Sequence, residues 1–563
     1  MKRKRLLTTT VVGSAGLALL NPQVGYTAGT PAIRPNIIVV VMDDFGLGQC
    51  EAYSRTLGAG DMDPHLVELV TGGHRNFKQH DPSEGLQASR QAMPFLTGLA
   101  DAGVRFNNAY SASSLCAPSR QALLSSRYPQ RWGVYNNAAA DETGVPLDQR
   151  CLPELLHEAG YATAAIGKWH VARVDDSLRD KVLDAEGWKG SRHWMQLRKA
   201  SPAMYKKAIA ETGYCGASVF AQHPLRRGFD YFFGYNWSGA TYYKADNIWE
   251  NDTFTGVRPD GEYNTELFTQ KAVDFLDRTL KDGKPAFIYL GYHAVHGSLN
   301  YKPPLKYLEK FNSKQEWVNS FYGHVNAVDE GIRSIFEKLK SYGQADNTLF
   351  IFTTDNGASG NSYGAILPFN APSKGAKGEA WQGGHRVPMI ASWPGRIKTG
   401  RVEEGLVSLM DIMPTAVEAS GAPVPAGLDG RSLLPLLNGR EKGPVHDTLF
   451  FFGIHSTIWS FPDDHYNEGD ERQAPLFAAA RQGDWLYKVI GSIPPGLYPD
   501  LPNGQPKQVL LFNIKNDPGE KNNVIAGNPE VAEALRKKLN GWTAETKPPL
   551  WVLKEKWEEI VQP

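Results

Sequence analysis

The stretch Asn36-Ile37-Ile38-Val39-Val40-Val41-Met42, followed directly by Asp43-Asp44, indicates the fold of this chain. The run is continuously apolar and rich in β-branched residues. It therefore predicts a strand that is buried on both faces of a parallel sheet. Because ligands bind beyond the carboxyl ends of the strands in open α/β sheets, the two aspartates are candidates for a functional site.

Three further apolar runs end in polar clusters in the same way. They are 162–166, which leads to Lys168 and His170; 286–289, which leads to His293 and His296; and 348–353, which leads to Asp355 and Asn356. Helical patterns lie between the runs, at 93–102, 152–159, 265–280 and 317–342. The alternation predicts an α/β fold in which a large, mostly parallel sheet is sandwiched by helices.

The pattern changes after about residue 440. Short strands are predicted at 448–452, 478–481, 485–490 and 509–512, and a closing helix at 528–542. We therefore expect a larger N-terminal domain, 31–440, and a smaller C-terminal α+β subdomain, 441–563, with a small antiparallel sheet and a helix.

The segments 51–92 and 175–222 interrupt the alternation of strands and helices in the larger domain. We expect them to be surface insertions near the mouth of the site.

The N-terminus carries the pattern of an export signal. Basic residues from Lys2 to Arg5 precede an apolar run from Leu6 to about Leu20, which Asn21-Pro22 ends. The run is short for a membrane span, so residues 1–30 are predicted to be a secretory signal peptide, with an uncleaved membrane anchor as the alternative. We expect a periplasmic or secreted protein that has no membrane span after cleavage.

The charge balance argues against one class of partner. Lys+Arg and Asp+Glu both number 60 in the 563 residues, so the formal net charge is zero. Proteins that bind nucleic acid usually carry a basic excess, and we therefore expect no nucleic-acid partner. A local basic pocket for an anion is compatible with this balance.

The most specific motif is Leu115-Cys116-Ala117-Pro118-Ser119-Arg120. A lone cysteine before a helix is often a buried thiol. The full stretch, however, resembles Cys-x-Pro-Ser-Arg, the signature of the type I, formylglycine-dependent sulfatases of the alkaline-phosphatase-like superfamily. In those enzymes the cysteine is oxidised to formylglycine (3-oxoalanine). The resemblance implies this modification of Cys116, and a formylglycine-generating or anaerobic sulfatase-maturating enzyme as a partner during biogenesis.

A hydrated aldehyde suits the hydrolysis of sulfate esters for a chemical reason. One of its two hydroxyl groups can attack sulfur. Deprotonation of the other hydroxyl then expels sulfate by C–O cleavage and regenerates the aldehyde, so that one difficult step becomes two easier ones. A serine alkoxide would instead leave a serine sulfate ester, which would have to be hydrolysed in turn.

The four oxygen-bearing side chains at two of the strand ends are candidate metal ligands. An isolated pair of such residues is more often a turn or a helix cap. In a chain with the cysteine signature, the resemblance implies that Asp43, Asp44, Asp355 and Asn356 hold a divalent cation together with the modified Cys116. Hard oxygen ligands fit Ca²⁺ or Mg²⁺ better than zinc, and the resemblance favours Ca²⁺. Such an ion would polarise the sulfate oxygens and orient the hydrated aldehyde.

Basic residues complete the catalytic set that the resemblance implies. Lys168 and His170 stand in GKWH, and Lys377 stands in SKGAKGEAWQGGHRVP, which is similar to the family motif around an active-site lysine. Arg120 and Lys168 would orient formylglycine and stabilise its alkoxide, while Lys168 and Lys377 would bind sulfate oxygens. His170 would remove the proton of the second hydroxyl.

Protonation of the leaving alcohol would fall to His296 or Lys377. The family motif usually has one histidine followed by a proline at this point, whereas Val295 and Gly297 flank His296. The choice between His296 and its neighbour His293 therefore stays open. The predicted substrate-binding set consists of Lys168, His293, His296 and Lys377.

The resemblance extends from about Pro35 to Trp542. Further stretches that resemble family blocks lie at 223–235, 408–421, 428–437 and 511–524, whereas 51–92 departs from the family. The resemblance implies a bacterial polysaccharide sulfatase with a catalytic N-terminal domain and a sulfated poly- or oligosaccharide as substrate.

An aromatic-rich stretch favours this substrate because aromatic faces suit sugar rings, although packing in the core is the alternative interpretation. Its members are Tyr235, Trp237, Tyr242, Tyr243 and Trp249.

Two other functions are compatible with the sequence. A phosphonate monoester or phosphodiester hydrolase of the same superfamily would share the fold, although Ser119 and the GKWH motif favour sulfate. An inactive, carbohydrate-binding relative is the second alternative, and the complete set of predicted ligands argues against it.

Overall fold

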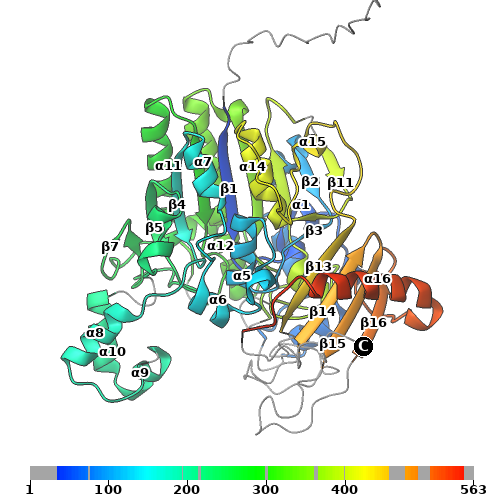
Figure 1. Ribbon diagram of the computed structural model, residues 1–563, viewed down its shortest axis with the longest axis horizontal. Coiled ribbons are helices and arrows are strands. Elements are labelled where there is room, and N and C mark those ends of the chain that lie inside the picture. Colours follow the sequence, from blue (N-terminus) through cyan, green and yellow to red (C-terminus); the bar gives the residue numbers. More distant parts are fainter. Residues whose placement is uncertain are drawn as a thin grey trace, which may run out of the picture. The chain divides into compact units, whose positions relative to one another are not determined.

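The computed structural model describes residues 34–73, 77–192, 194–212, 217–297, 302–360, 365–397, 400–454, 476–491 and 508–550. The predicted signal peptide, residues 1–30, lies outside the described residues. The predicted α/β sandwich and the antiparallel C-terminal sheet both lie within them (Figure 1).

Strand β1 (Asn36–Met42) lies in the middle of the large sheet. It pairs in parallel with β8 (Ala286–Gly291) on one side and with β9 (Thr348–Thr354) on the other. Beyond β8 the parallel strands β4 (Ala162–Lys168) and β5 (Tyr231–Tyr235) follow. The carboxyl ends of β9, β1, β8 and β4 therefore stand next to one another along a single edge.

Shorter strands extend the sheet at both sides, in the order β11-β2-β10-β9-β1-β8-β4-β5-β6-β7. Strand β10 runs antiparallel to both of its neighbours, and β6 and β7 also pair in antiparallel fashion. These outer strands are β2 (Val104–Phe106), β6 (Trp249–Glu250), β7 (Thr253–Phe254), β10 (Met389–Ser392) and β11 (Arg401–Glu403). A separate pair is formed by β3 (Ala109–Tyr110) and β12 (Val407–Ser408).

Helices cover both faces of the large sheet, as predicted. Ile38 and Val40 of β1 join a buried core with helices α4 (Pro94–Ala102), α11 (Asn264–Lys281) and α12 (Glu316–Ser341). Ile37 and Val39 point the other way, into a core with α5 (Cys116–Ser125), α7 (Leu152–Glu158) and α14 (Ile412–Ala419). Because successive side chains of a strand alternate between faces, an apolar residue at every position gives a strand that is buried on both sides.

The predicted C-terminal sheet is also confirmed. Its four antiparallel strands are β13 (Thr448–Ile454), β14 (Leu476–Gln482), β15 (Trp485–Gly491) and β16 (Gln508–Asn513). Helix α16 (Pro529–Thr543) packs on one face through Leu535, Leu539 and Trp542. The other face buries Phe477 and Phe512 against Trp381, which follows the predicted active-site lysine in the chain.

The two predicted insertions are both largely helical. Segment 51–92 contains α1 (Glu51–Ser54), α2 (Pro64–Thr71) and α3 (Pro82–Ser89), and its apolar side chains pack against the region of Leu367 and Phe369. Segment 175–222 contains α8 (Ser177–Ala185), α9 (Trp194–Ala200) and α10 (Pro202–Thr212). Leu183, Leu197 and Ile209 form the centre of this second unit.

Candidate active site

The polar clusters at the four adjacent strand ends come together. Asp43 and Asp44 follow β1, and Asp355 and Asn356 follow β9, and all four side chains are buried. Lys168 ends β4, with His170 two residues later, and His293 and His296 follow β8. The order β9-β1-β8-β4 places acidic groups beside basic ones across neighbouring strands.

Cys116 is the first residue of helix α5, and its side chain is fully buried. Its Sγ lies 4.0 Å from Oδ1 of Asp44. One turn later, Nη1 of Arg120 donates to the Lys168 carbonyl at 3.1 Å and to the Tyr289 hydroxyl at 3.0 Å. Burial raises the pKa of the Cys116 thiol to about 12, although Lys168 opposes the shift.

Two lysines bind the two aspartates that follow β1. Nζ of Lys168 donates to Oδ2 of Asp43 at 2.8 Å, and Nζ of Lys377 lies 2.7 Å from Oδ1 of Asp44. Burial alone would raise the pKa of Asp44, but Lys377, His296 and Lys168 together lower it below its usual range. Asp44 has a positive φ of 60°, an uncommon backbone conformation for a residue other than glycine.

The loop that carries Lys377 is fastened on two sides. The backbone N–H of Lys377 donates to the Ala358 carbonyl at 3.0 Å, just beyond Asn356. The next N–H, of Gly378, donates to the Ser114 carbonyl at 2.9 Å, just before Cys116. The lysine is thus held between the metal-ligand candidates and the cysteine.

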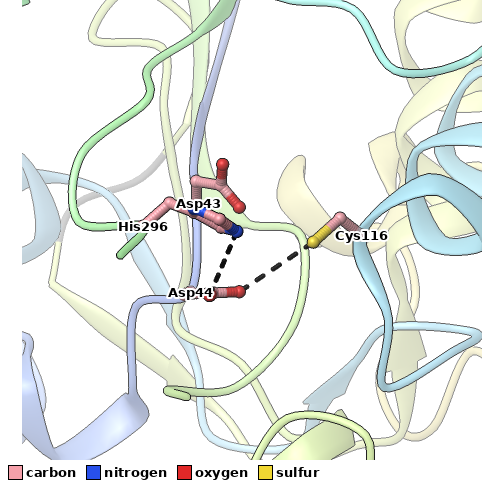
Figure 2. A group of neighbouring side chains, drawn as sticks. All are labelled: Asp43, Asp44, Cys116 and His296. Carbon is pink, nitrogen blue, oxygen red and sulfur yellow. Dashed lines mark hydrogen bonds and ion pairs between the residues drawn. The ribbon is translucent and has the colours of Figure 1, made fainter. Parts of the chain in front are cut away.

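Four of the side chains form a group that could hold a metal ion (Figure 2). Asp43, Asp44, Cys116 and His296 each offer one ligand atom, and these atoms lie within 4.8 Å of one another. Figure 2 shows that Asp44 contacts both His296 and Cys116. The sequence analysis predicted the first three members as ligands and His296 as a catalytic and substrate-binding residue, and the structure places His296 next to them.

Asp355 and Asn356, the other two predicted ligands, adjoin this group. Nδ2 of Asn356 donates to Oδ1 of Asp44 at 2.8 Å, and the backbone N–H of Asp44 donates to Oδ1 of Asp355 at 3.3 Å. Burial raises the pKa of Asp355, with Arg120 opposing the shift and Asp43 adding to it.

Unsatisfied oxygens show that these residues fit a cation. Oδ1 of Asp43 and Oδ1 of Asn356 are buried and accept no hydrogen bond from any residue that the structure describes. Buried polar atoms are nearly always paired, so two orphaned acceptors beside two further carboxylates call for a positive partner. A donor set of carboxylate and amide oxygens suits a hard divalent cation.

The two histidines after β8 occupy different environments. Nε2 of His296 lies 3.8 Å from Oδ2 of Asp44, and its side chain is 23% exposed, more than that of Asp44. His293 is buried, its Nδ1 pairs with the Tyr235 hydroxyl at 3.0 Å, and its Nε2 has no hydrogen-bond partner among the described residues. Burial lowers the pKa of both rings well below the usual value. His296 is therefore the histidine that touches the acidic group.

His170 brings in a residue that the sequence did not predict. Its Nε2 lies 3.1 Å from Oδ1 of Asp141, which belongs to the short helix α6 (Asn137–Thr143). No motif surrounds Asp141 in the sequence, so only the tertiary contact identifies it.

The chain matches one known protein family over most of its length. The sequence model of the family described as Sulfatase matches residues 35–422, a span that contains every side chain of the site. The chain belongs to the sulfatase family.

Curated relatives of this sulfatase cover nearly its full length. The protein named "Uncharacterized sulfatase YdeN" of Escherichia coli (strain K12) is 30% identical, over 94% of this chain and 89% of that protein. N-acetylgalactosamine-6-sulfatase of Homo sapiens is 28% identical, over 89% of this chain and 83% of that protein. Arylsulfatase G of Rattus norvegicus is 26% identical, over 94% and 90%.

Solved structures share the fold of this sulfatase. The crystal structure of Ps i-CgsB superposes with a TM-score of 0.65 at 25% identity, covering 94% of this chain and 98% of that one. The complex of Ps i-CgsB with k-i-k-neocarrahexaose also gives a TM-score of 0.65, at 24% identity and the same coverage. Among the described residues of this sulfatase, no helix has both the length and the apolar character needed to cross a membrane.

The burial of the aromatic stretch 235–249 agrees only in part with the expectation that its side chains contact a sugar. Tyr235 and Tyr242 are fully buried in the core, so their faces cannot stack on a sugar. Trp237, Tyr243 and Trp249 are half-buried. Packing in the core accounts for the first two, as the alternative interpretation held.

Proposed function

We propose that this protein hydrolyses sulfate esters of a poly- or oligosaccharide, with a formylglycine made from Cys116 and a bound divalent cation. The observation that carries the proposal is the position of Cys116. It begins a helix, is fully buried, and lies 4.0 Å from Asp44 inside a group of potential metal ligands that two lysines flank. A nucleophile that attacks an anionic ester would act beside such positive charges.

The unmodified thiol is poorly suited to attack. Since burial raises the pKa of Cys116 to about 12, little thiolate is present near neutral pH. When formed, a hydrated formylglycine supplies one hydroxyl as the nucleophile toward sulfur and a second whose deprotonation releases sulfate. The Cys-Ala-Pro-Ser-Arg stretch is the signal through which a formylglycine-generating or anaerobic sulfatase-maturating enzyme would recognise the chain.

Asp43, Asp44, Asp355 and Asn356 would hold the cation together with the group derived from Cys116. We assign Ca²⁺ in preference to Mg²⁺, because a site built from several carboxylate and amide oxygens suits Ca²⁺, whereas Mg²⁺ usually keeps several waters. When bound, the ion supplies positive charge that polarises sulfate oxygens and offsets the clustered carboxylates. The orphaned oxygens of Asp43 and Asn356 support this assignment.

The flanking cations would bind the substrate and the nucleophile. Lys168 and Lys377 are buried or nearly so, and each already faces a carboxylate of the acidic group. In a site shielded from water such fixed charges stabilise a sulfate ester and the charge that develops on it. Arg120, which donates to the carbonyl of Lys168, would orient the modified residue at the start of its own helix.

Proton transfer would be divided between two histidines. We assign His170, buried beside Lys168, as the base that takes the proton of the second hydroxyl. His296 is assigned as the acid toward the leaving alcohol, because its partly exposed ring lies beside Asp44, whose charge favours the protonated ring against the effect of burial. Lys377 is the alternative acid, and His293 completes the substrate-binding set behind His296.

A carbohydrate substrate is favoured by the relatives. N-acetylgalactosamine-6-sulfatases of several mammals are 27% or 28% identical over about nine-tenths of this chain. The names of these relatives describe a sulfate on a sugar. Trp237, Tyr243 and Trp249, all half-buried, are the aromatic residues of the stretch that could contact a sugar ring.

We also propose that the protein is exported to the periplasm or beyond. The basic and apolar pattern of residues 1–30 supports a cleaved signal peptide. N-terminal sequencing of the protein purified from the periplasmic and culture fractions would identify the cleavage point. A mature chain that still begins at Met1 would contradict export by this route.

Sulfate release from a panel of esters tests the function. Wild-type protein, purified after coexpression with a maturation enzyme, is offered sulfated glycosaminoglycan fragments, sulfated algal galactan fragments, an aryl sulfate, an aryl phosphodiester and a phosphonate monoester. We expect release from a sulfated sugar with far higher kcat/KM than from the aryl sulfate, and no release with Cys116→Ala. Preferential turnover of phosphorus esters, or no turnover of any ester by converted protein, would overturn the proposal.

A further inference from the structure

Helix α6 (Asn137–Thr143) contacts both the helix that begins with Cys116 and the proposed base, His170. Oδ1 of Asn137 accepts a hydrogen bond at 3.1 Å from the backbone N–H of Ala117, the residue after Cys116. Four residues later, Oδ1 of Asp141 lies 3.1 Å from Nε2 of His170. Residues four apart share one face of a helix, so a single face contacts both the cysteine helix and the histidine.

The position of Asp141 is fixed by its own backbone. Its carbonyl accepts from the N–H of Val174 at 2.9 Å, which ties α6 to the segment that follows His170. At the other end of the helix, the side chain of Asn136 caps the N–H of Ala139 at 2.8 Å. The carboxylate therefore meets the ring from a helix that is hydrogen-bonded at both ends, an arrangement that suits holding a side chain in one orientation.

The ring of His170 is held in an equally defined position. Its backbone has a positive φ of 51°, and the next N–H, of Val171, donates to Oδ1 of Asn236 at 3.2 Å. The residue is 1% exposed. Its second ring nitrogen, Nδ1, is buried and has no hydrogen-bond partner among the described residues.

We propose that Asp141 is a positioning residue for the sulfatase reaction, which keeps the His170 proton on Nε2 and leaves Nδ1 as the proton acceptor. The inference rests on the proposed function, in which His170 is the base. A carboxylate that binds one ring nitrogen fixes the tautomer and the orientation of a histidine, and it stabilises the imidazolium that forms when the other nitrogen takes a proton.

The charges around the pair agree with this assignment. Burial lowers the pKa of His170 well below its usual value, and the cations Lys168 and Arg120 lower it further, while Asp355 opposes them and Lys377 adds to the lowering. The ring is therefore neutral before it accepts a proton. Burial raises the pKa of Asp141 to about 7, with Lys168 opposing the shift.

The protonation state of Asp141 then decides which tautomer is favoured. As a carboxylate it can only accept, so it selects the tautomer with hydrogen on Nε2. As a neutral acid it can donate to Nε2, which selects hydrogen on Nδ1 and removes the proposed base. The rate of sulfate release should therefore rise as the pH passes upward through about 7.

Asp141→Asn is the direct kinetic test. We expect kcat for the best sulfated substrate to fall about 100-fold, with KM nearly unchanged, because the base acts only in the chemical step. The rise of kcat through about pH 7 should also disappear. The matched control is Glu142→Gln, an exposed carboxylate on the same helix, which should keep the wild-type rate and pH profile. Peptide mass confirms equal conversion of Cys116 in all proteins.

Rescue separates positioning from a structural role. In Asp141→Ala, added formate or acetate should restore part of kcat, since the Asp141 side chain is 17% exposed and a small carboxylate can reach the vacated place. A helix that was merely destabilised would not respond to a carboxylate. A kcat for Asp141→Asn within about twofold of the Glu142→Gln control, with an unchanged pH profile, would overturn the inference.

A spectroscopic measurement is independent of turnover. In wild-type protein with ¹⁵N-labelled histidine, the His170 signals are those lost in His170→Gln. Well above pH 7 we expect hydrogen on Nε2 and a bare Nδ1, whereas hydrogen on Nδ1 would overturn the inference. Absence of sulfate release by converted wild-type protein would refute the proposed function, and the tautomer would still decide the Asp141–His170 relationship.

Discussion

Arg120 and Asp355 form an ion pair in which neither side chain is exposed, with Nη2 of the arginine 2.8 Å from Oδ2 of the aspartate. Arg120 lies one turn after Cys116 on helix α5, and Asp355 follows strand β9. The pair fastens the helix that begins with the cysteine to the edge of the sheet that carries the proposed metal ligands. The catalytic geometry and the stability of the fold therefore share one contact.

Replacement of Arg120 by Met should lower the free energy of unfolding by about 3–5 kcal/mol, because it leaves Asp355 buried without its partner. Urea unfolding monitored by fluorescence measures the change. The matched control is Arg55→Met, whose partner Asp101 is half exposed, and its effect should stay below about 1 kcal/mol. Equal losses in the two variants would contradict the role assigned to the buried pair.

Asn356→Ala should weaken metal binding without adding or removing charge. The variant lacks the orphaned oxygen and also the hydrogen bond from Nδ2 to Asp44. Calcium content after dialysis should fall relative to wild type, and added Ca²⁺ should raise the thermal midpoint less. Asp346→Ala removes an exposed carboxylate elsewhere and should leave both quantities unchanged. A full complement of calcium in the Asn356 variant would exclude this residue as a ligand.

Asp329 makes stability depend on pH. It accepts from the N–H groups of Phe95 and Leu96 at the start of α4, yet burial raises its pKa to about 6. A raised pKa means that the folded chain binds this proton more tightly than the unfolded chain does. The contribution of this proton is complete below pH ~4 and is lost as the pH rises to about 6.

Asp329→Asn should remove this dependence. Relative to the variant, wild-type protein should lose up to about 3 kcal/mol of unfolding free energy between pH ~4 and pH ~7. Urea unfolding of both proteins at the two pH values gives the difference. A wild-type advantage that is constant, or that grows with pH, would refute the assignment.

Gly239→Ala should slow the reaction while the fold stays intact. An added Cβ would lie 3.2 Å from Nδ1 and 3.3 Å from Cε1 of His296, so that ring would have to shift. We expect kcat to fall by about tenfold or more and the thermal midpoint to change little. Gly60→Ala, where the added carbon meets open space, is the control. An unchanged kcat would show that His296 does not need its present position.

The central strands were predictable because their patterns are local. Asn36–Met42 is apolar at every position after Asn36, and Thr348–Thr354 has an apolar centre from Leu349 to Phe352 between β-branched threonines. Such short runs are typical of strands that are buried on both faces. Strand β10 was not predicted, since the four residues Met389–Ser392 carry no periodic signal and become a strand through β9 and β2. Segment 51–92 did offer a signal: Asp63-Pro64 and Asp81-Pro82 are cap-and-proline starts of helices.

Most of the candidate site follows from strand ends and motifs, but two features do not. His296 enters the group of potential ligands because β8 ends beside β1, which sequence spacing cannot specify. Asp141 stands in a short helix without a motif, and its contact with His170 depends on how α6 packs against the segment after β4. The burial of Tyr235 and Tyr242 could not be predicted either, because they pack in a core with residues of helices that are distant in the sequence.

The most direct test joins the modification of Cys116 to sulfate release in one titration. Protein is prepared with graded coexpression of a maturation enzyme, and the converted fraction is read from the mass of the tryptic peptide that contains Cys116. Sulfate release from the best sulfated sugar is measured on the same samples. The account predicts a rate that is proportional to the converted fraction and vanishes with it. A rate that persists in wholly unconverted protein would contradict it.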